Sequence, residues 1–123
     1  MTSKKTILVA EDEKAISSVI ALKLQREGFD VICAYDGEEA IEKMKKEKID
    51  LLLLDLVMPK KDGFEVLEAM KKEKIKIATI VSSNLSQKED MQKVLSLGAV
   101  DYFIKSETSI SDVIGHVKKV LGL

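Results

Sequence analysis

The sequence contains very few of the residues that build disulfide-stapled or cysteine-rich metal proteins, and it has no long apolar stretch. Cys33 is the single cysteine among 123 residues, which excludes a disulfide framework and a cysteine-based zinc site. Because Cys33 lies within the apolar run 31–34, we interpret it as a small buried hydrophobic residue. No segment approaches the ~20 apolar residues of a membrane span, and the apolar run near the N-terminus is too short for a signal sequence. We therefore expect a cytoplasmic protein that does not enter the membrane.

An excess of charge of either sign is also missing. The chain has 20 basic and 21 acidic residues and a formal net charge of -1. This balance gives no sign of a general attraction to nucleic acid or to anionic membranes, so we expect no direct nucleic-acid binding. The length fits one domain over residues 1–123, which is long enough to bury roughly two thirds of its unfolded surface.

Short β-type runs alternate with longer helical patterns along the whole chain. The apolar runs predict strands at 6–10, 30–34, 51–54, 77–81 and 100–104, with a helix after each of them. Such alternation is typical of α/β proteins with a parallel sheet. Right-handed crossovers and helices on both faces favour a doubly wound five-stranded sheet over a barrel, which would need eight such units.

The most apolar run of the chain ends in an ionisable residue. Four consecutive leucines at 51–54 are followed directly by Asp55 and soon by Pro59. Because the leucines do not alternate with polar residues, both faces of this strand are predicted to be buried, as in the centre of a parallel sheet. Asp55 then lies at the carboxyl end of a central strand, where open α/β sheets bind ligands. The alternative interpretation at this position is an aspartate that caps a helix or a turn.

Polar side chains follow three of the predicted strands. Glu11, Asp12 and Glu13 come after the first strand, Asp55 after the third and Lys105 after the fifth. If the strand order is 2-1-3-4-5, the first and third strands are neighbours and these carboxylates face one another. Carboxylates at such close range need a counter-charge, and Mg²⁺ prefers oxygen ligands of this kind. With Lys105 nearby, the pocket suits a phosphoryl group, whereas capping of the first helix is the simpler explanation of the acidic run alone.

These residues, together with Met58-Pro59, Asp62-Gly63 and a serine after the fourth strand, resemble the receiver domains of two-component response regulators. The resemblance extends over essentially the whole chain. It implies a flavodoxin-like three-layer sandwich with strand order 2-1-3-4-5. It also implies a monomer or weak dimer that acts as a stand-alone chemotaxis-type regulator, as a phosphoryl shuttle, or as one domain of a longer regulator.

The resemblance assigns a phosphoacceptor and a metal site. Asp55 would take a phosphoryl group from a histidine kinase or a phosphotransfer protein, with at most self-phosphorylation and slow dephosphorylation as its own activity. Asp12 and Asp55 would bind Mg²⁺, with Glu11 holding the ion directly or through water. The backbone carbonyl of Val57 would be a further ligand.

The remaining assigned residues would sense the phosphoryl group. Lys105 would pair with one phosphoryl oxygen, and Ser83 would give its hydroxyl to another. Ser82 is the alternative hydroxyl, but the spacing of Ser83 to Gly98 and Lys105 fits the family better. Tyr102 would rotate inward when Ser83 moves, or it is a plain core residue. The resulting change would alter a surface that binds a downstream protein target.

The chain departs from the family pattern at three positions. Glu11 stands where aspartate is commoner, Asn84 stands where a small residue is usual, and Ser106 replaces the usual proline after Lys105. Without proline, we expect either a trans bond with altered loop geometry or a strained cis bond. These departures leave open a receiver-like protein-interaction module that is not phosphorylated.

Two enzymatic or cofactor readings fit the sequence less well. A phosphohydrolase with Asp55 as nucleophile would need a second aspartate at position 57, where the chain has Val57. A flavin phosphate would need glycine, serine or threonine donors after the first strand, where the chain has carboxylates. His116 has no carboxylate or thiol at ligand spacing in the sequence, so we interpret it as a structural residue.

Overall fold

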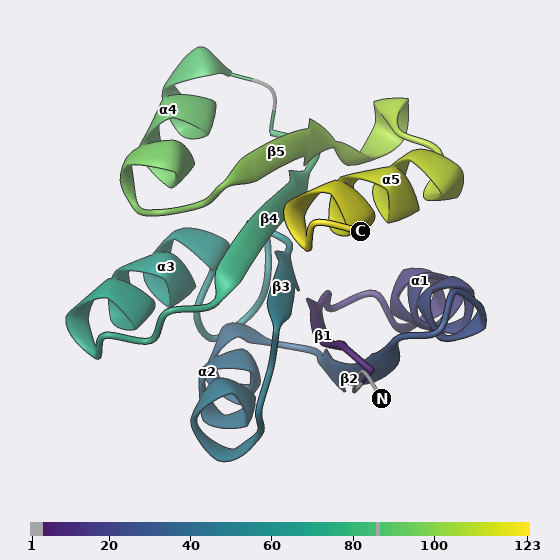
Figure 1. Cartoon of the computed structure of the whole chain (residues 1–123). Coiled ribbons are helices and arrows are strands. Elements are labelled where there is room, and N and C mark those ends of the chain that lie inside the picture. Colours follow the sequence, from purple (N-terminus) through teal and green to yellow (C-terminus); the bar gives the residue numbers. More distant parts are fainter. Residues whose placement is uncertain (1–3, 86) are drawn as a thin grey trace.

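The computed structural model describes residues 4–85 and 87–123, in which strands and α-helices alternate (Figure 1). The elements are β1 (Thr6–Ala10), α1 (Lys14–Arg26), β2 (Asp30–Ala34), α2 (Gly37–Lys46), β3 (Leu51–Leu54), α3 (Gly63–Lys72), β4 (Ala78–Ser83), α4 (Lys88–Ser96), β5 (Asp101–Ile104), a short 3-10 helix η1 (Lys105–Glu107) and α5 (Ile110–Val120). In the part of the chain that the structure describes, no helix is long and apolar enough to cross a membrane.

The five strands form one parallel sheet in the order β2-β1-β3-β4-β5. Helices α2, α3 and α4 pack on one face of the sheet, and α1 and α5 pack on the other (Figure 1). The predicted doubly wound three-layer sandwich and its strand order are therefore confirmed. Because all strands run parallel, their carboxyl ends meet at one edge, and β1 and β3 are neighbours at the point where the connections change direction.

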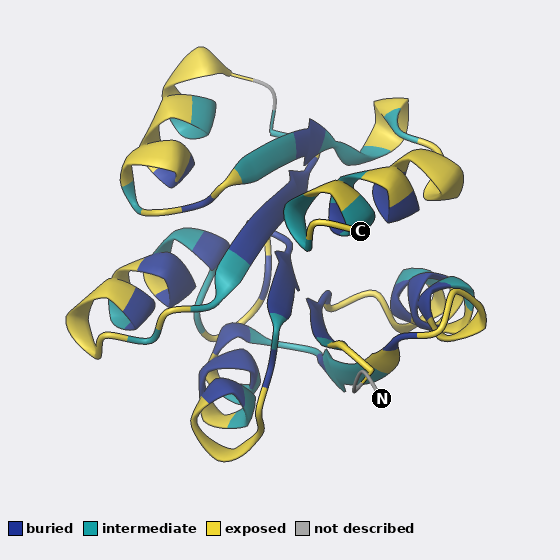
Figure 2. Ribbon diagram, in the orientation of Figure 1, coloured by how far each residue is buried: buried dark blue, intermediate teal, exposed yellow. Residues whose placement is uncertain are grey.

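The leucines of β3 divide between the two faces of the sheet. Leu52 and Leu54 pack with α2, α3 and α4, whereas Leu51 and Leu53 pack with α1 and α5. All four are at most 2% exposed, so the prediction that both faces of this strand are buried is confirmed (Figure 2). This is the expected result for a central strand, where side chains alternate between two covered faces.

Strand β4 differs from its predicted range of 77–81 because it continues through Ser82 and Ser83. These serines pair with Phe103 and Ile104 of β5, so two residues that were predicted to follow the strand belong to it. Strand β5 begins at Asp101, one residue later than predicted. The extension holds both serine hydroxyls on the sheet itself instead of on a loop.

The prediction that Cys33 is buried is wrong, because this residue is only partly buried. Strand β2 is at the edge of the sheet and pairs only with β1, so its central residues are less covered than those of β3. The edge position is a property of the strand order, which local apolarity does not reveal.

Candidate functional site

Three carboxylates from the ends of β1 and β3 lie within reach of one another. The backbone ladder continues one residue past each strand, since Glu11 N–H donates to Ala34 and Asp55 N–H donates to Ala10, both at 3.0 Å. Glu11, Asp12 and Asp55 each offer one oxygen such that all three oxygens lie within 4.8 Å of one another. The strand order thus brings together the acidic residues that the sequence analysis placed in one site.

The donor set and its spacing fit a small, hard cation. Ligand oxygens around one Mg²⁺ lie about 3 to 4 Å apart, because each metal–oxygen bond is about 2.1 Å long. Small side-chain rotations bring oxygens that are within 4.8 Å to this spacing. Asp12 is exposed at the mouth of the cluster, while Glu11 and Asp55 are 3% and 6% exposed. This arrangement leaves the outer side of an ion accessible to water or to a further ligand.

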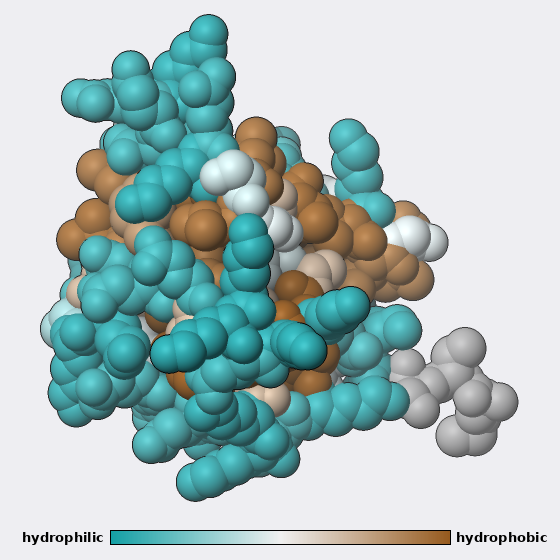
Figure 3. Space-filling view, turned by 90° about the vertical axis from the view of Figure 1, so that its left-hand side faces the viewer, coloured by the Kyte–Doolittle hydropathy of each residue, from teal (hydrophilic) through white to brown (hydrophobic). Residues whose placement is uncertain are grey.

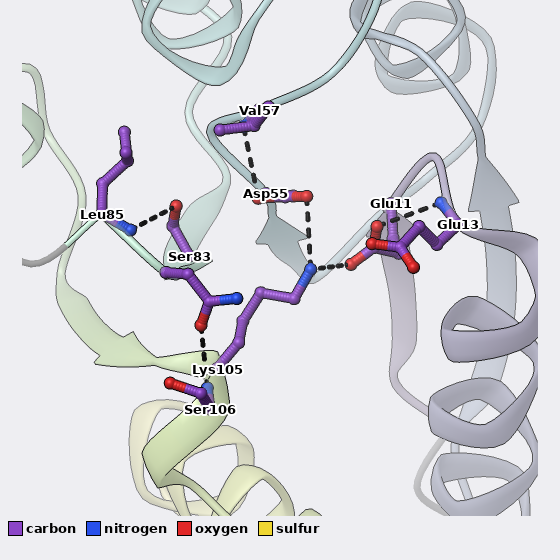
Figure 4. A network of polar contacts seen from close by, with 9 residues as sticks. Glu11, Glu13, Asp55, Val57, Ser83, Leu85, Lys105 and Ser106 are labelled. Carbon is purple, nitrogen blue, oxygen red and sulfur yellow. Dashed lines mark hydrogen bonds and ion pairs between the residues drawn. The ribbon is translucent and has the colours of Figure 1, made fainter.

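Lys105 extends from the end of β5 into the acidic cluster (Figure 4). Its Nζ lies 3.3 Å from Asp55 Oδ2 and also forms an ion pair with Glu11 Oε1. One ammonium group thus serves two carboxylates that are almost inaccessible to water. Such a contact offsets part of the cost of burying like charges side by side.

Burial changes the ionisation of this cluster. Loss of hydration raises the pKa of Asp55 from its ordinary value of 3.8 to about 6; the Lys105 ammonium works against this rise, and the Glu11 charge adds to it. For Lys105, burial favours the neutral amine, but the carboxylates of Glu11 and Asp55 outweigh it and raise the pKa. At neutral pH, the site therefore holds an ionised but poorly solvated Asp55 beside a charged lysine.

The loop after β3 holds Asp55 in place. Val57 N–H donates to Asp55 Oδ1 at 3.2 Å (Figure 4). Gly63 N–H donates to the Leu56 carbonyl at 2.9 Å. A Cβ atom at Gly63 would lie 2.6 Å from the Asp55 carbonyl oxygen, so only glycine allows α3 to begin this close to the strand end. The structure places Val57 next to the cluster, and the role of its carbonyl as a ligand remains a prediction.

Ser83 and Tyr102 meet at the backbone of Leu85. Ser83 is fully buried, and its Oγ accepts a hydrogen bond from Leu85 N–H at 3.2 Å, while Tyr102 Oη donates to the Leu85 carbonyl. Tyr102 itself is half-buried. A movement of the Ser83 hydroxyl would therefore act on the same residue that anchors the tyrosine hydroxyl. Ser82 occurs at the α1 and α5 side of the sheet and takes no part in this chain of contacts.

Two of the departures from the family pattern contact each other. Asn84 Oδ1 accepts a hydrogen bond from Ser106 N–H at 2.9 Å. Proline at position 106 would have no N–H to donate, so the asparagine and the serine form a link between the β4–α4 loop and the residue after Lys105. All peptide bonds in residues 4–85 and 87–123 are trans, which includes the bond between Lys105 and Ser106.

A hollow of about 290 Å³ opens beside these side chains. Its walls come from the loops after β1, β3, β4 and β5: Asp12, Glu13, Asp55, Val57, Ser83, Asn84, Leu85 and Lys105. Glu11 lies behind this opening, in contact with Lys105. An anion that entered the hollow would meet an ammonium group, a hydroxyl and the acidic metal-ligand set together.

Sequence reasoning missed one polar pair outside this site. His116 Nδ1 contacts Asp101 Oδ2, and the imidazole stacks on Phe103 with 5.2 Å between ring centroids. The sequence spacing around His116 gave no sign of this carboxylate, and the interpretation of His116 as a structural residue stays a prediction. The two residues are on different elements, α5 and β5, and no local spacing signals their contact.

Comparisons with known proteins agree with this geometry. The profile of a family described as "Response regulator receiver domain" matches residues 7–117. The chain is 39% identical over 117 residues to the alkaline phosphatase synthesis transcriptional regulatory protein PhoP of Bacillus subtilis, which covers 95% of this chain and 48% of PhoP. The chain thus spans about half the length of this curated relative.

Solved structures are similar over nearly the full length. The receiver domain of a Francisella response regulator superposes with a TM-score of 0.89 at 32% identity, covering 95% of this chain and 96% of that one. The response regulator TrrA of Thermotoga maritima, solved in complex with Mg²⁺ and BeF, superposes with a TM-score of 0.83, also at 32% identity, covering 94% and 98% of the two chains.

Proposed function

Because the chain belongs to the family of response regulator receiver domains, we propose that it is the phosphoacceptor of a two-component phosphorelay. In this proposal, residues 1–123 form one cytoplasmic receiver domain, and Asp55 receives a phosphoryl group from a histidine kinase or phosphotransfer protein. The main support is the buried Asp55 carboxylate, which lies beside two further carboxylates and the Lys105 ammonium group. A downstream protein target would bind the phosphorylated form.

The proposed reaction transfers a phosphoryl group without net oxidation or reduction. A carboxylate oxygen of Asp55 forms a bond to phosphorus while the bond between phosphorus and the donor's imidazole nitrogen breaks. The bonding electrons return to the imidazole, which then takes a proton from solvent. Asp55 is suited to attack because it is fixed by Val57 N–H through Oδ1, while Oδ2 faces Lys105.

The chain's own residues supply binding and positioning for this step. Asp12, Glu11 and Asp55, with the Val57 carbonyl, would hold Mg²⁺, which neutralises charge on the phosphoryl oxygens when it is bound. Lys105 moves from its carboxylate partners to a phosphoryl oxygen, which keeps the ammonium paired throughout. Ser83 donates its hydroxyl to another phosphoryl oxygen.

The response of the surface follows from the contacts of Leu85. When the Ser83 hydroxyl turns to the phosphoryl group, Oγ gives up the Leu85 N–H. The β4–α4 loop then rearranges, and Tyr102 loses its present partner, the Leu85 carbonyl. Tyr102 rotates inward as a result, and the surface of α4, β5 and α5 changes for the protein target.

A second candidate function is a receiver-like interaction module that is not phosphorylated. It is favoured by the Glu11 to Lys105 ion pair and by the Asn84 to Ser106 hydrogen bond, which together hold the lysine in the acidic cluster. If these contacts do not release, Lys105 cannot follow a phosphoryl oxygen.

Labelling with acetyl phosphate distinguishes the two functions. In the presence of Mg²⁺, the intact mass of the unaltered protein should increase by one phosphoryl group. The mass should not increase when Mg²⁺ is omitted or in the Asp55→Asn variant. Lys105→Ala should retain some labelling but lose the change in Tyr102 NMR signals that follows labelling of the unaltered protein. Absence of labelling, or labelling that persists in Asp55→Asn, would refute Asp55 as the phosphoacceptor.

A further inference from the structure

A second hollow lies at the amino ends of β4 and β5, on the side of the sheet away from Asp55. It has a volume of about 490 Å³ and is formed where α3 leads into β4 and where α4 leads into β5. Apolar side chains from α3 and from both connections form its floor and walls: Leu67, Met70, Ile75, Ile77, Leu97 and Val100. Figure 3 shows this side of the molecule, where apolar surface is visible between hydrophilic side chains. We call this hollow the α3–α4 slot.

The apolar surface of the α3–α4 slot reaches the solvent. Val100, in the connection before β5, is 55% exposed, although an apolar side chain gains stability from burial. Leu97, Ile75 and Ile77 are only partly buried. The volume of the slot lies within the range of about 300 to 1,000 Å³ that is common for ligand-binding pockets.

The charged residues that line the α3–α4 slot are all basic. Lys71 and Lys76 lie along it, and Lys72, the last residue of α3, and Lys74 are exposed beside them. Glu73 is the single acidic residue in this connection, and it is paired with Lys45 at 2.6 Å. The rim of the slot therefore has a positive local charge, even though the whole chain has a net charge of -1.

Helix capping accounts for only part of this charge. Basic residues in the last helical turn stabilise the helix dipole, which explains Lys71 and Lys72 at the end of α3. The effect falls off within one turn, however, and Lys74 and Lys76 lie beyond the last helical residue. The helix dipole therefore does not explain Lys76, whose charge lies next to the apolar slot.

We propose that the α3–α4 slot binds an acidic amphipathic helix of a partner protein. Apolar side chains on one face of such a helix would enter the slot, and carboxylates on its flanks would pair with Lys71 and Lys76. The concave shape argues against a lipid surface, which is bound by protruding apolar groups. The apolar lining argues against duplex nucleic acid, because phosphate contacts gain nothing from it.

The proposal is independent of phosphorylation at Asp55. The acidic cluster lies at the carboxyl ends of the strands, whereas the slot lies at the amino ends of β4 and β5. A partner helix in the slot therefore leaves the Asp55 pocket open to a phosphodonor. Such a contact would hold the protein near a partner in both its phosphorylated and unphosphorylated forms.

Fluorescence anisotropy with the full chain tests this proposal. The probe is a fluorescein-labelled peptide of about 18 residues, with leucines at i, i+3, i+4 and i+7 on one helical face and glutamates elsewhere. Charge reversal in the double variant Lys71→Glu/Lys76→Glu should raise its Kd about tenfold or more. The matched control Lys46→Glu/Lys48→Glu reverses two exposed lysines at the end of α2, outside the slot, and should leave Kd within about twofold.

Apolar contact is tested by a second pair of variants. Val100→Ser should weaken peptide binding about threefold or more, whereas Val19→Ser, which changes an equally exposed valine on α1, should not. A peptide of the same composition with leucines distributed around the helix should bind about tenfold more weakly.

Four results would overturn the proposal. The first two are no measurable binding of the amphipathic peptide, and equal binding of the peptide with distributed leucines. The third is an equal loss of peptide affinity in the slot variant and in the α2 control variant. The fourth is displacement of the peptide by duplex DNA or phosphatidylserine vesicles at a lower concentration than by unlabelled peptide. Acetyl phosphate labelling of Asp55 in the same variants reports independently on the proposed function.

Discussion

At the scale of single residues, the attraction of Lys105 for Asp55 and Glu11 opposes the repulsion between the two buried carboxylates. Two carboxylates that are nearly inaccessible to water share one ammonium group. A structure selected only for stability would place apolar residues of similar volume there, because a buried ion pair seldom repays its loss of hydration. The proposed function accounts for these charges, because it requires an anionic nucleophile and a cation that can change partners.

Replacement of Asp55 should therefore stabilise the protein at neutral pH. The folded protein binds a proton at Asp55 more tightly than the unfolded chain does, since the pKa is about 6 instead of 3.8. Stability is thus lost as the pH rises from about 4 to 6, and Asp55→Asn removes this loss. In metal-free buffer at pH 7.5, we expect the variant to gain about 1 to 3 kcal/mol in unfolding free energy, measured by urea denaturation.

The pH dependence provides the decisive comparison. At pH 4, the gain from Asp55→Asn should shrink to less than about 1 kcal/mol, because the unaltered carboxyl is then protonated in the folded state. Asp12→Asn changes an exposed carboxylate of the same cluster and should alter stability by less than about 0.5 kcal/mol at either pH. An equal or larger gain at pH 4 would contradict this account of the Asp55 charge.

At the scale of elements, close approach between the start of α2 and the β3–α3 loop shapes the site. A Cβ atom at Gly37 would lie 2.0 Å from the Lys61 carbonyl oxygen, which no folded backbone tolerates. Asp36, which caps α2, has a carboxylate oxygen 3.7 Å from Lys60 Nζ, and Lys60 has a φ of 66°. The start of α2, at Asp36 and Gly37, is therefore in direct contact with the loop that follows Asp55.

Substitution of Gly37 by alanine should disturb this loop. We expect Gly37→Ala to lower the unfolding free energy by about 2 to 4 kcal/mol, because backbone atoms must move to admit the methyl group. A displacement of the loop should also slow acetyl phosphate labelling of Asp55 about tenfold or more, measured under conditions in which the variant is folded.

Gly115 supplies the matched control within the same protein. It is a helical glycine in α5 whose Cβ would meet nothing within 4 Å. Gly115→Ala should therefore raise stability by about 0.5 to 1 kcal/mol through helix propensity and leave labelling unchanged. Equal stability or equal labelling of the two alanine variants would show that the Gly37 contact does not position the loop.

The elements also show where sequence reasoning reached its limit. The alternation of apolar runs and helical periods predicted the five strands and five α-helices that the structure describes, but not the short helix η1, because those periods reflect which side chains face the core. The end of β4 could not be predicted, because Ser82 and Ser83 are strand residues only through their pairing with β5. The contact between Asn84 and Ser106 was likewise hidden, since the residues lie in different loops.

At the scale of the whole molecule, two apolar cores share one sheet. Leu52 faces the core under α2, α3 and α4, and Leu53 faces the core under α1 and α5. Because adjacent residues of β3 anchor both cores, neither helical layer can detach without exposing the strand between them. The two layers should therefore unfold together.

Alanine variants of these two leucines test this coupling. Leu52→Ala and Leu53→Ala should each cost about 3 kcal/mol or more, and both should retain a single urea transition that coincides by far-ultraviolet circular dichroism and tyrosine fluorescence. Val19→Ala, at a half-exposed position on α1, should cost less than about 1 kcal/mol. Separate transitions in either leucine variant would mean that the layers unfold independently.

In the whole molecule, basic and acidic residues lie at opposite ends of the helices, although the sequence contains nearly equal numbers of both. Each α-helix has a basic residue in its last turn, and four of the five have an acidic residue in the first. Because the helices in this fold run opposite to the strands, their basic C-terminal ends lie near the amino ends of the strands, away from Asp55 (Figure 1). The net charge of -1 is therefore the sum of a basic region near the amino ends of the strands and an acidic region near their carboxyl ends.

The sequence by itself determined the elements, their parallel arrangement and the residues that gather at the strand ends, because apolar periodicity and the alternation of strands with helices can be followed along the chain. The tertiary structure decided which groups touch: Lys105 with both Glu11 and Asp55, Leu85 with Ser83 and Tyr102, and the lysines of one connection with an apolar slot. These contacts depend on distances between segments that are far apart in the chain, and the free energies of burial and charge pairing act only across those distances.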